Sequence, residues 1–284
     1  MSAPRIARAA FRRLSPRTRS AVLHRFGIFA PWEEGFDFTP PDLRPGEIIG
    51  PPDFVGIGVQ KGGTSWWYEL IASHPGVSAR ADIHKERHYF SHLVTQPFGE
   101  AEVNQYHGWF PRLPGTIVGE WTPDYLAHPW VPELLHRAAP DTRLLVIVRD
   151  PVERFRSGLS FRLSLGTIED EGTVADAVRQ GFYARFLRRY LDHFSYDQLL
   201  VLQYEQCVLD PAGQLAATYE FLGLDAHQPD ALRTGVNVSG AKRPIDPDTG
   251  RRLAALYAPD VEDLYSLFPH LDRSLWPSID VVGE

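Results

Sequence analysis

Short apolar runs alternate with amphipathic segments along most of the chain. The three clearest runs are residues 54–59 (FVGIGV), 143–149 (RLLVIVR) and 199–204 (LLVLQY). Each has the length and composition of a buried strand, and helical periodicity follows the first one until about His74. Strands that alternate with helices predict a parallel sheet. We therefore expect an α/β fold, with a P-loop-like parallel sheet flanked by helices on both faces.

Capping residues mark the helix boundaries. Asp150 precedes Pro151, and Glu153 stands at the position of a capping-box partner, which predicts a helix over residues 151–164. Further helical patterns cover residues 173–194 and 211–224, and Gly223 closes the second of these.

The chain divides into a lead-in and a main domain. Residues 26–53 are rich in proline and other turn residues, which favours an extended connection. We expect residues 1–50 to form a basic N-terminal extension with this proline-rich lead-in, and residues 51–284 to form one domain. With 284 residues, 43% of them hydrophobic, the chain can bury one large core or two modest ones.

The cysteine content and the length of the apolar runs indicate the cellular compartment of the protein. The single Cys207 excludes an internal disulfide framework and fits a reducing compartment. No apolar run approaches the ~20 residues of a membrane-spanning helix, and the N-terminus lacks the apolar core of a secretory signal. We expect a cytoplasmic protein.

Charge is unevenly distributed along the chain. The net charge of -7 argues against a nucleic-acid binder. Residues 5–25 nevertheless carry seven arginines and no acid, with apolar residues at roughly helical spacing. We favour a helix with a solvated arginine face, and the alternative is peripheral contact with an anionic membrane. Only three of the 29 basic residues are lysine, so Lys61, Lys85 and Lys242 are candidates for functional cations.

The glycine loop GVQKGGTSWW, residues 58–67, is the main chemical signal. A Walker phosphate loop reads G-x-x-x-x-G-K-[ST]. Here Thr64 stands where that lysine belongs, and Lys61 lies inside the loop instead. Gly62 and Gly63 let the backbone approach an anion, and Thr64 and Ser65 add hydroxyl and N–H groups at a helix N-terminus. An anion such as a phosphate is the expected ligand.

Three segments are expected to meet at one edge of the sheet. Ligands of open α/β sheets bind beyond the carboxyl ends of the strands. The glycine loop, Arg149 and the stretch after Tyr204 all leave predicted strands at that edge.

Two of these segments resemble those of the PAPS-dependent sulfotransferases, where PAPS is 3′-phosphoadenosine 5′-phosphosulfate. QKGGTSWWYELIASHPGV is similar to the loop that binds the 5′-phosphosulfate, and LLVIVRDPVERFRSGLSFR is similar to the segment that binds the 3′-phosphate. The resemblance implies the first role for Lys61, Gly62, Gly63, Thr64 and Ser65, and the second for Arg149 and Ser157.

A third donor segment is less specific. Gly240, Lys242 and Arg243 in NVSGAKRP resemble the loop with which the family often closes over the 3′-phosphate. The alternative is a solvated basic turn before Pro244.

HKERHYF, residues 84–90, resembles the catalytic segment of the heparan sulfate type of sulfotransferase. The match implies that Glu86 is the general base and His88 a supporting or orienting group, although His88 is a rival base. Lys85 beside them would lower a carboxylate pKa or bind substrate or donor. The alternative is a solvated charged turn.

VGEWTPDYL, residues 118–126, is similar to the family's acceptor segment and implies substrate contacts for Trp121, Thr122 and Tyr125. Trp121 replaces the family's usual lysine. An indole face suits a neutral sugar or an apolar group better than an anionic polymer.

The sequence therefore predicts a sulfotransferase that moves a sulfuryl group from PAPS to a hydroxyl or amine of a glycan, a glycolipid or another small molecule. By the family resemblance PAPS is the co-substrate and no metal is required. Two alternatives stay open: a P-loop kinase that uses ATP and Mg²⁺, and a non-catalytic nucleotide-binding or membrane-recruited module.

Overall fold

The computed structural model describes residues 39–94, 96–164, 171–229, 232 and 244–280. The arginine-rich stretch and residues 240–243 lie outside the described residues. Within the described chain, no helix combines the length and the apolar character needed to cross a bilayer.

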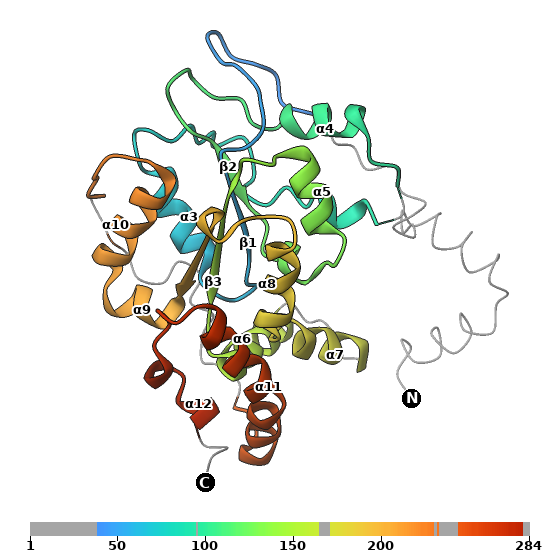
Figure 1. Cartoon of the computed structure of the whole chain (residues 1–284), viewed down its shortest axis with the longest axis vertical. Coiled ribbons are helices and arrows are strands. Elements are labelled where there is room, and N and C mark those ends of the chain that lie inside the picture. Colours follow the sequence, from blue (N-terminus) through green and yellow to red (C-terminus); the bar gives the residue numbers. More distant parts are fainter. Residues whose placement is uncertain (1–38, 95, 165–170, 230–231, 233–243, 281–284) are drawn as a thin grey trace, which may run out of the picture.

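Four strands form one parallel sheet in the order β2-β1-β3-β4 (Figure 1). The strands are β1 (Phe54–Gly58), β2 (Gly119–Trp121), β3 (Arg143–Val148) and β4 (Leu199–Gln203). The α-helices are α3 (Thr64–Ala72), α4 (Glu100–His107), α5 (Val131–Ala138), α6 (Pro151–Ser164), α7 (Glu171–Arg179), α8 (Tyr183–Leu191), α9 (Tyr204–Leu209), α10 (Pro211–Leu222), α11 (Pro247–Leu267) and α12 (Pro277–Asp280). Short 3₁₀ turns are η1 (Phe90–His92), η2 (Tyr125–Ala127), η3 (Tyr196–Gln198) and η4 (Arg273–Leu275).

The three predicted strands coincide with β1, β3 and β4, and the expected α/β fold is confirmed. Helices α3 and α10 cover one face of the sheet, while α5 and α8 cover the other (Figure 1). Each face has its own core. Trp66, Trp67 and Tyr219 belong to the core on the α3 side, and a larger core that includes Val146 and Tyr190 lies on the α8 side.

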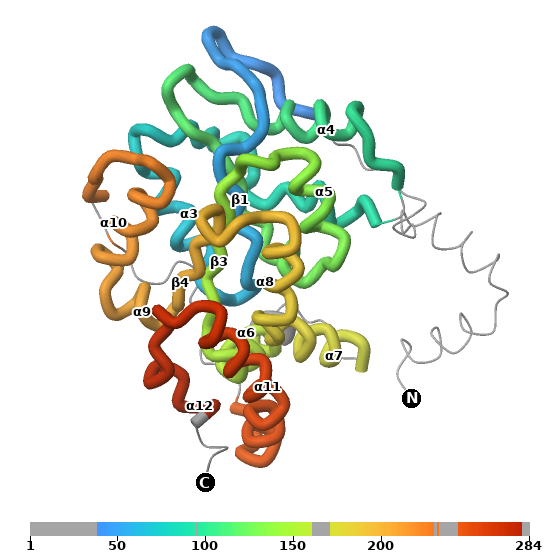
Figure 2. Tube along the Cα trace, viewed as in Figure 1, coloured from blue at the N-terminus to red at the C-terminus, as the bar shows by residue number. Residues whose placement is uncertain are grey.

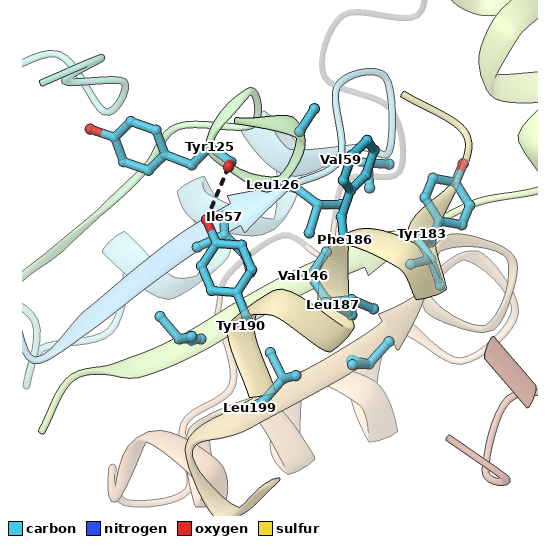
Figure 3. Close-up of a cluster of buried hydrophobic side chains, with 14 of the residues drawn as sticks. Ile57, Val59, Tyr125, Leu126, Val146, Tyr183, Phe186, Leu187, Tyr190 and Leu199 are labelled. Carbon is cyan, nitrogen blue, oxygen red and sulfur yellow. Dashed lines mark hydrogen bonds between the residues drawn. The ribbon is translucent and has the colours of Figure 1, made fainter. Parts of the chain in front are cut away.

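Helix α8 contributes one apolar face to the larger core. Figure 3 shows Tyr183, Phe186, Leu187 and Tyr190 turned toward the strand residues, including Val146. The Tyr190 hydroxyl also donates a 3.0 Å hydrogen bond to the carbonyl of Tyr125. Packing of this kind fixes the ends of β1 and β3, where the glycine loop and Arg149 begin.

The predicted helix over residues 173–194 is in fact two helices, α7 and α8, separated by a turn at Gly181. A Cβ atom at Gly181 would lie 2.6 Å from the Tyr257 ring, so only glycine fits this close approach to α11. The N-terminal amides of α8 are capped by Asp260 of α11 at 2.9 and 3.0 Å. Tertiary contacts therefore place the break, which periodicity did not reveal.

The predicted end caps of α6 and α10 are present, but the expected capping box at α6 is wrong in its second half. The Asp150 amide donates to Glu205 Oε1 at 3.2 Å instead of to Glu153, which pairs with Arg156 at 2.7 Å. The Asp150 carboxylate accepts from the amides of Val152 (2.9 Å) and Glu153 (3.1 Å) at the start of α6. Gly223 ends α10 in the left-handed conformation, with φ 69°.

Candidate active site

The glycine loop joins the carboxyl end of β1 to α3 and packs against the end of β3. A Cβ atom at Gly62 would lie 2.5 Å from the Ile147 carbonyl oxygen, so the backbone approaches β3 too closely for any side chain. Gly63 has φ 89°, which favours glycine, and a Cβ there would lie 2.8 Å from the Tyr204 ring. These two contacts fix the loop on the sheet.

Gly63 is also the N-cap of α3, so no side chain caps the first amides of that helix. The first turn of α3 contains no acidic residue. The amides of a first turn have no partners within the helix and carry partial positive charge. With the hydroxyls of Thr64 and Ser65, this turn is chemically suited to an anion.

Lys61 lies in the same loop with a left-handed backbone conformation, φ 69°. Burial lowers the pKa of its ammonium to about 8, against the opposing effect of the Glu86 carboxylate. The fold thus brings the Lys61 ammonium close enough to the Glu86 carboxylate for the two charges to interact, although 25 positions separate the residues in the sequence.

Arg149 ends β3 and faces the glycine loop. Its Nη1 donates to the Lys61 carbonyl at 3.2 Å, and its guanidinium lies 4.5 Å from the centroid of the Tyr204 ring. Its Nε is buried and has no hydrogen-bond partner among the described residues. Arg149 as a whole is only partly buried, and a guanidinium of this kind is suited to a phosphate-like anion. Ser157 lies buried in the second turn of α6, which begins two residues after Arg149.

Glu86 lies between two cationic groups. Lys85 Nζ donates to Glu86 Oε1, and His88 Nε2 lies 3.2 Å from Glu86 Oε2. Burial opposes ionisation of this carboxyl, yet the hydrogen bonds from His88 and Lys85 lower its pKa to about 2. Glu86 is therefore an ionised acceptor throughout the neutral range.

His88 has a carboxylate on each side of its ring. Its Nδ1 lies 3.3 Å from Asp124 Oδ2, and its Nε2 faces Glu86. Because ionised carboxylates only accept hydrogen bonds, both ring nitrogens carry protons. The hydrogen bonds with Asp124 and Glu86 raise the pKa of His88 to about 10.

Asp124 is a site residue that sequence reasoning missed. It comes from the segment after β2, where it also accepts from the Ser91 hydroxyl at 3.1 Å. The hydrogen bonds from His88 and Ser91 lower the pKa of Asp124 in spite of its burial. Thirty-six positions separate it from His88, so no local spacing could have paired them.

Glu120 is a second residue that sequence reasoning missed, and it holds the backbone of residues 86–88. Its buried carboxylate accepts from the hydroxyls of Tyr106 (2.7 Å) and Thr122 (2.5 Å) and from the Arg87 amide (3.2 Å). The Arg87 amide lies between Glu86 and His88, and His88 has φ 51°. The Glu120 network therefore holds this left-handed turn in place.

Trp121, Thr122 and Tyr125 require a correction as acceptor contacts, because all three are fully buried. The Trp121 indole donates to the Gly58 carbonyl at 3.1 Å and fills the space over Gly56, where a Cβ would lie 2.0 Å from the ring. Thr122 and Tyr125 direct their hydroxyls toward Glu120. The indole therefore offers no face to an acceptor, and all three residues make internal contacts behind residues 84–90.

Lys85 is in direct contact with the candidate base Glu86. Besides Glu86 it approaches the Trp121 carbonyl at 3.5 Å, and the Trp121 amide donates to the Lys85 carbonyl at 2.9 Å. Gly240, Lys242 and Arg243 are outside the described residues, so their proposed role stays a prediction.

Comparison with known proteins identifies the family. The family described as "Sulfotransferase domain" matches residues 51–238. The chain belongs to this sulfotransferase family. It is a member of the PAPS-dependent sulfotransferase superfamily, as the glycine loop and the Arg149 segment predicted.

Curated relatives of this sulfotransferase include enzymes named for heparan sulfate. It is 35% identical over 191 residues to mouse heparan sulfate glucosamine 3-O-sulfotransferase 6, covering 61% of this chain and 52% of the relative. It is 34% identical over 188 residues to human heparan sulfate glucosamine 3-O-sulfotransferase 3B1, covering 61% of this chain and 46% of the relative. The chain thus spans about half the length of the curated relatives it matches.

Solved structures agree on the fold. A sulfotransferase from Alicyclobacillus acidocaldarius superposes with a TM-score of 0.64 at 25% identity, over 81% of this chain and 100% of that one. A sulfotransferase domain from the curacin biosynthetic pathway gives a TM-score of 0.50 at 12% identity, over 72% of this chain and 97% of that one, and shows a shared fold alone.

Proposed function

We propose that this sulfotransferase transfers the sulfuryl group of PAPS to a carbohydrate hydroxyl, with Glu86 as the general base. One observation carries the proposal. Arg149 donates to the carbonyl of Lys61, while Lys61 lies within the electrostatic reach of Glu86. The proposal is supported because two cations and an ionised carboxylate lie together at the carboxyl edge of a parallel sheet, where such sheets bind ligands.

The donor-binding residues fit a molecule that has two separate anionic groups. The uncapped first turn of α3, with Lys61, would hold the 5′-phosphosulfate. Arg149, whose buried Nε is without a partner in the described chain, would hold the 3′-phosphate, together with Ser157. The Gly62 amide already donates to the Val59 carbonyl at 2.9 Å, so we assign the anion contacts to the first-turn amides of α3.

The chemistry assigned to these residues is a single displacement at sulfur. The hydroxyl oxygen of the acceptor forms a bond to sulfur while Glu86 accepts the proton of that hydroxyl. At the same time the bond between sulfur and the oxygen that bridges to the 5′-phosphate breaks. Lys61 stabilises the negative charge that develops on that leaving oxygen, where a placed cation has its largest effect. The products are the sulfated acceptor and adenosine 3′,5′-bisphosphate.

Glu86 is favoured over His88 as the base. An imidazolium that donates from both ring nitrogens has no lone pair for an acceptor proton. We assign His88 and Asp124 to orienting the Glu86 carboxylate. The depressed pKa of Glu86 makes it a weak base in the free protein, but it is in the right protonation state at neutral pH.

A carbohydrate acceptor is supported by the names of the curated relatives. Within the described site, however, position 121 holds a buried indole instead of the family's lysine, and Lys85 is paired with Glu86. An anionic polymer would find fewer cations here, so we favour a neutral or weakly charged sugar.

Calorimetric titration with adenosine 3′,5′-bisphosphate, beside ATP with Mg²⁺, tests the proposal. We expect the bisphosphate to bind without metal, and Arg149→Ala to weaken its binding at least ~10-fold because a bidentate charged contact is lost. Arg188→Ala, which removes an exposed arginine on α8, is the matched control. Binding of ATP with Mg²⁺ but not of the bisphosphate would instead assign a kinase.

A further inference from the structure

After α11 the chain crosses the carboxyl ends of β4 and β3. We call residues 268–279 the C-terminal strap, shown in red beside α9 in Figure 2. The Gln203 side chain at the end of β4 forms two reciprocal 2.9 Å hydrogen bonds with the Asp272 backbone. His270 Nε2 lies 2.8 Å from the Val201 carbonyl, so the strap is attached to β4 before it reaches β3.

Trp276 is the strap residue that connects to the end of β3 through Glu205. Its ring is fully buried, and its Nε1 donates to Glu205 Oε2 at 2.8 Å. The other oxygen of Glu205 accepts from the Asp150 amide at 3.2 Å. A single carboxylate therefore links the strap to the residue directly after Arg149.

Ser278 makes the last of these contacts. Its hydroxyl lies 2.6 Å from Asp150 Oδ1 and 2.5 Å from Oδ2. Asp150 is almost fully buried and also caps α6, so Ser278 completes the set of donors around it. The strap thus contacts the junction of β3 and α6 in two ways. Ser278 binds the Asp150 carboxylate directly, and Trp276 binds Glu205, which in turn binds the Asp150 amide.

The same junction determines where the Arg149 guanidinium lies. The Arg149 carbonyl accepts from the Tyr183 hydroxyl at 2.9 Å, and the Asp150 amide is held by Glu205. The backbone of residues 149 and 150 is therefore fixed by α8 on one side and by the strap on the other. The guanidinium leaves this fixed backbone toward the Lys61 carbonyl and the Tyr204 ring.

We propose that the C-terminal strap positions Arg149 for the 3′-phosphate of the donor, with Ser278 and Trp276 as the positioning residues. The strap lies outside residues 51–238, which match the family, so this role belongs to a part of the chain that the family match does not cover. The inference rests on the proposed function, in which Arg149 binds the 3′-phosphate.

A positioning role differs from general support of the fold in one measurable respect. Loss of the Ser278 hydroxyl should weaken binding of a ligand that has a 3′-phosphate and leave a ligand without it unaffected. The test compares dissociation constants of adenosine 3′,5′-bisphosphate and adenosine 5′-phosphate by calorimetry. Their ratio reports the 3′-phosphate contact alone.

The variants are Ser278→Ala, Ser278→Thr, which keeps the hydroxyl, and Ser274→Ala as the matched control. Ser274 belongs to the same strap, but its hydroxyl contacts Asp272 rather than Asp150. We expect Ser278→Ala to lower the preference for the bisphosphate about tenfold, as for the loss of a hydrogen bond to a charged group. Ser278→Thr and Ser274→Ala should keep the wild-type ratio. Trp276→Phe, which keeps a ring but loses the bond to Glu205, should lower the ratio in the same direction.

Two outcomes would overturn the inference alone. Either Ser278→Ala and Trp276→Phe keep the wild-type ratio while Arg149→Ala loses it, or both ligands weaken equally, as expected for a purely structural role. Failure of the proposed function looks different. In that case the wild-type protein itself shows no preference for the bisphosphate, or Arg149→Ala leaves the preference unchanged.

Discussion

At the scale of single residues, the candidate base lies in a chain of alternating charges. Lys85, Glu86, His88 and Asp124 follow one another through direct contacts, so each carboxylate faces a cation. Such a chain holds every group in one orientation and one protonation state. It leaves Glu86 as the ionised acceptor, with its two neighbours as hydrogen-bond donors to it.

The first prediction concerns Glu86→Gln. The amide keeps the size of the side chain but cannot accept the acceptor's proton, so kcat should fall at least ~100-fold. Steady-state kinetics with PAPS and a sugar acceptor measure this. Glu69→Gln, at an exposed position of α3, should leave kcat unchanged. A near wild-type rate for Glu86→Gln would assign proton removal to another group.

The second prediction is a pH dependence that originates at Lys61. Its pKa is lowered to about 8, so the ammonium loses its proton as the pH rises through that value. We expect kcat/KM for the donor to fall about tenfold per pH unit above pH 8, because the charged form stabilises the leaving oxygen. Glu86 adds no slope in this range, since its pKa is about 2.

Lys61→Arg separates this explanation from others. Arginine keeps its charge to above pH ~12, so the variant should be slower overall but should lack the decline above pH 8. If the decline persists in Lys61→Arg, the titrating group is not Lys61.

At the scale of elements, the glycine loop depends on its contact with β3. The third prediction is that Gly62→Ala lowers kcat/KM about 100-fold, because the new Cβ meets a backbone oxygen of Ile147 that has no freedom to retreat. The loop must then shift away from β3 and carry Lys61 with it. Kinetics and urea unfolding together show whether function suffers more than stability.

Gly250→Ala is the matched control for that substitution. Gly250 lies in α11, where a Cβ would come no closer than 3.9 Å to Ile245. Alanine is the better helix former, so this variant should be more stable by about 0.5–1 kcal/mol with unchanged activity. A similar loss of activity in both variants would show that the Gly62 contact is not the cause.

The elements that were predicted carry strong local signals, although helix α11 was not predicted in spite of its Asp246 cap and its proline at the start. Strands β1, β3 and β4 are continuous apolar runs, and α6 and α10 carry their own caps, so the fold followed from local patterns. Strand β2 has only three residues and was missed. The burial of Trp121 could not be read from the sequence either, because it depends on the parallel pairing of Trp121 with Gly56, which offers the ring its space.

The candidate site divides in the same way. Lys61, Glu86 and Arg149 belong to short motifs and were found from the sequence. Asp124 and Glu120 were missed because their partners, His88 and the Arg87 amide, lie more than thirty positions away. Motifs therefore identified the groups proposed to meet the substrates, whereas the groups that orient them emerge only from the folded chain.

At the scale of the whole molecule, the proposed donor site joins segments from most of the described chain. Lys61 follows β1, Arg149 ends β3, Tyr204 begins α9, and the C-terminal strap supports the junction at Asp150. A ligand that contacts Lys61 and Arg149 would therefore join the chain ends of β1 and β3, next to the junction that the strap supports. Its binding should be visible as stability of the entire fold.

The fourth prediction is a thermal shift. A ligand at 100 times its dissociation constant stabilises the folded state by about 2.7 kcal/mol, which for a chain of 284 residues raises Tm by about 4–5 °C. We expect that shift from adenosine 3′,5′-bisphosphate in differential scanning calorimetry. Arg149→Ala at the same ligand concentration should show about half of it, because a tenfold weaker affinity leaves about 1.4 kcal/mol. Arg188→Ala, whose exposed partner is Asp263, should keep the full shift. Equal shifts in the wild type and Arg149→Ala would place the bisphosphate away from β3, because a ligand can stabilise the fold only through the groups that bind it.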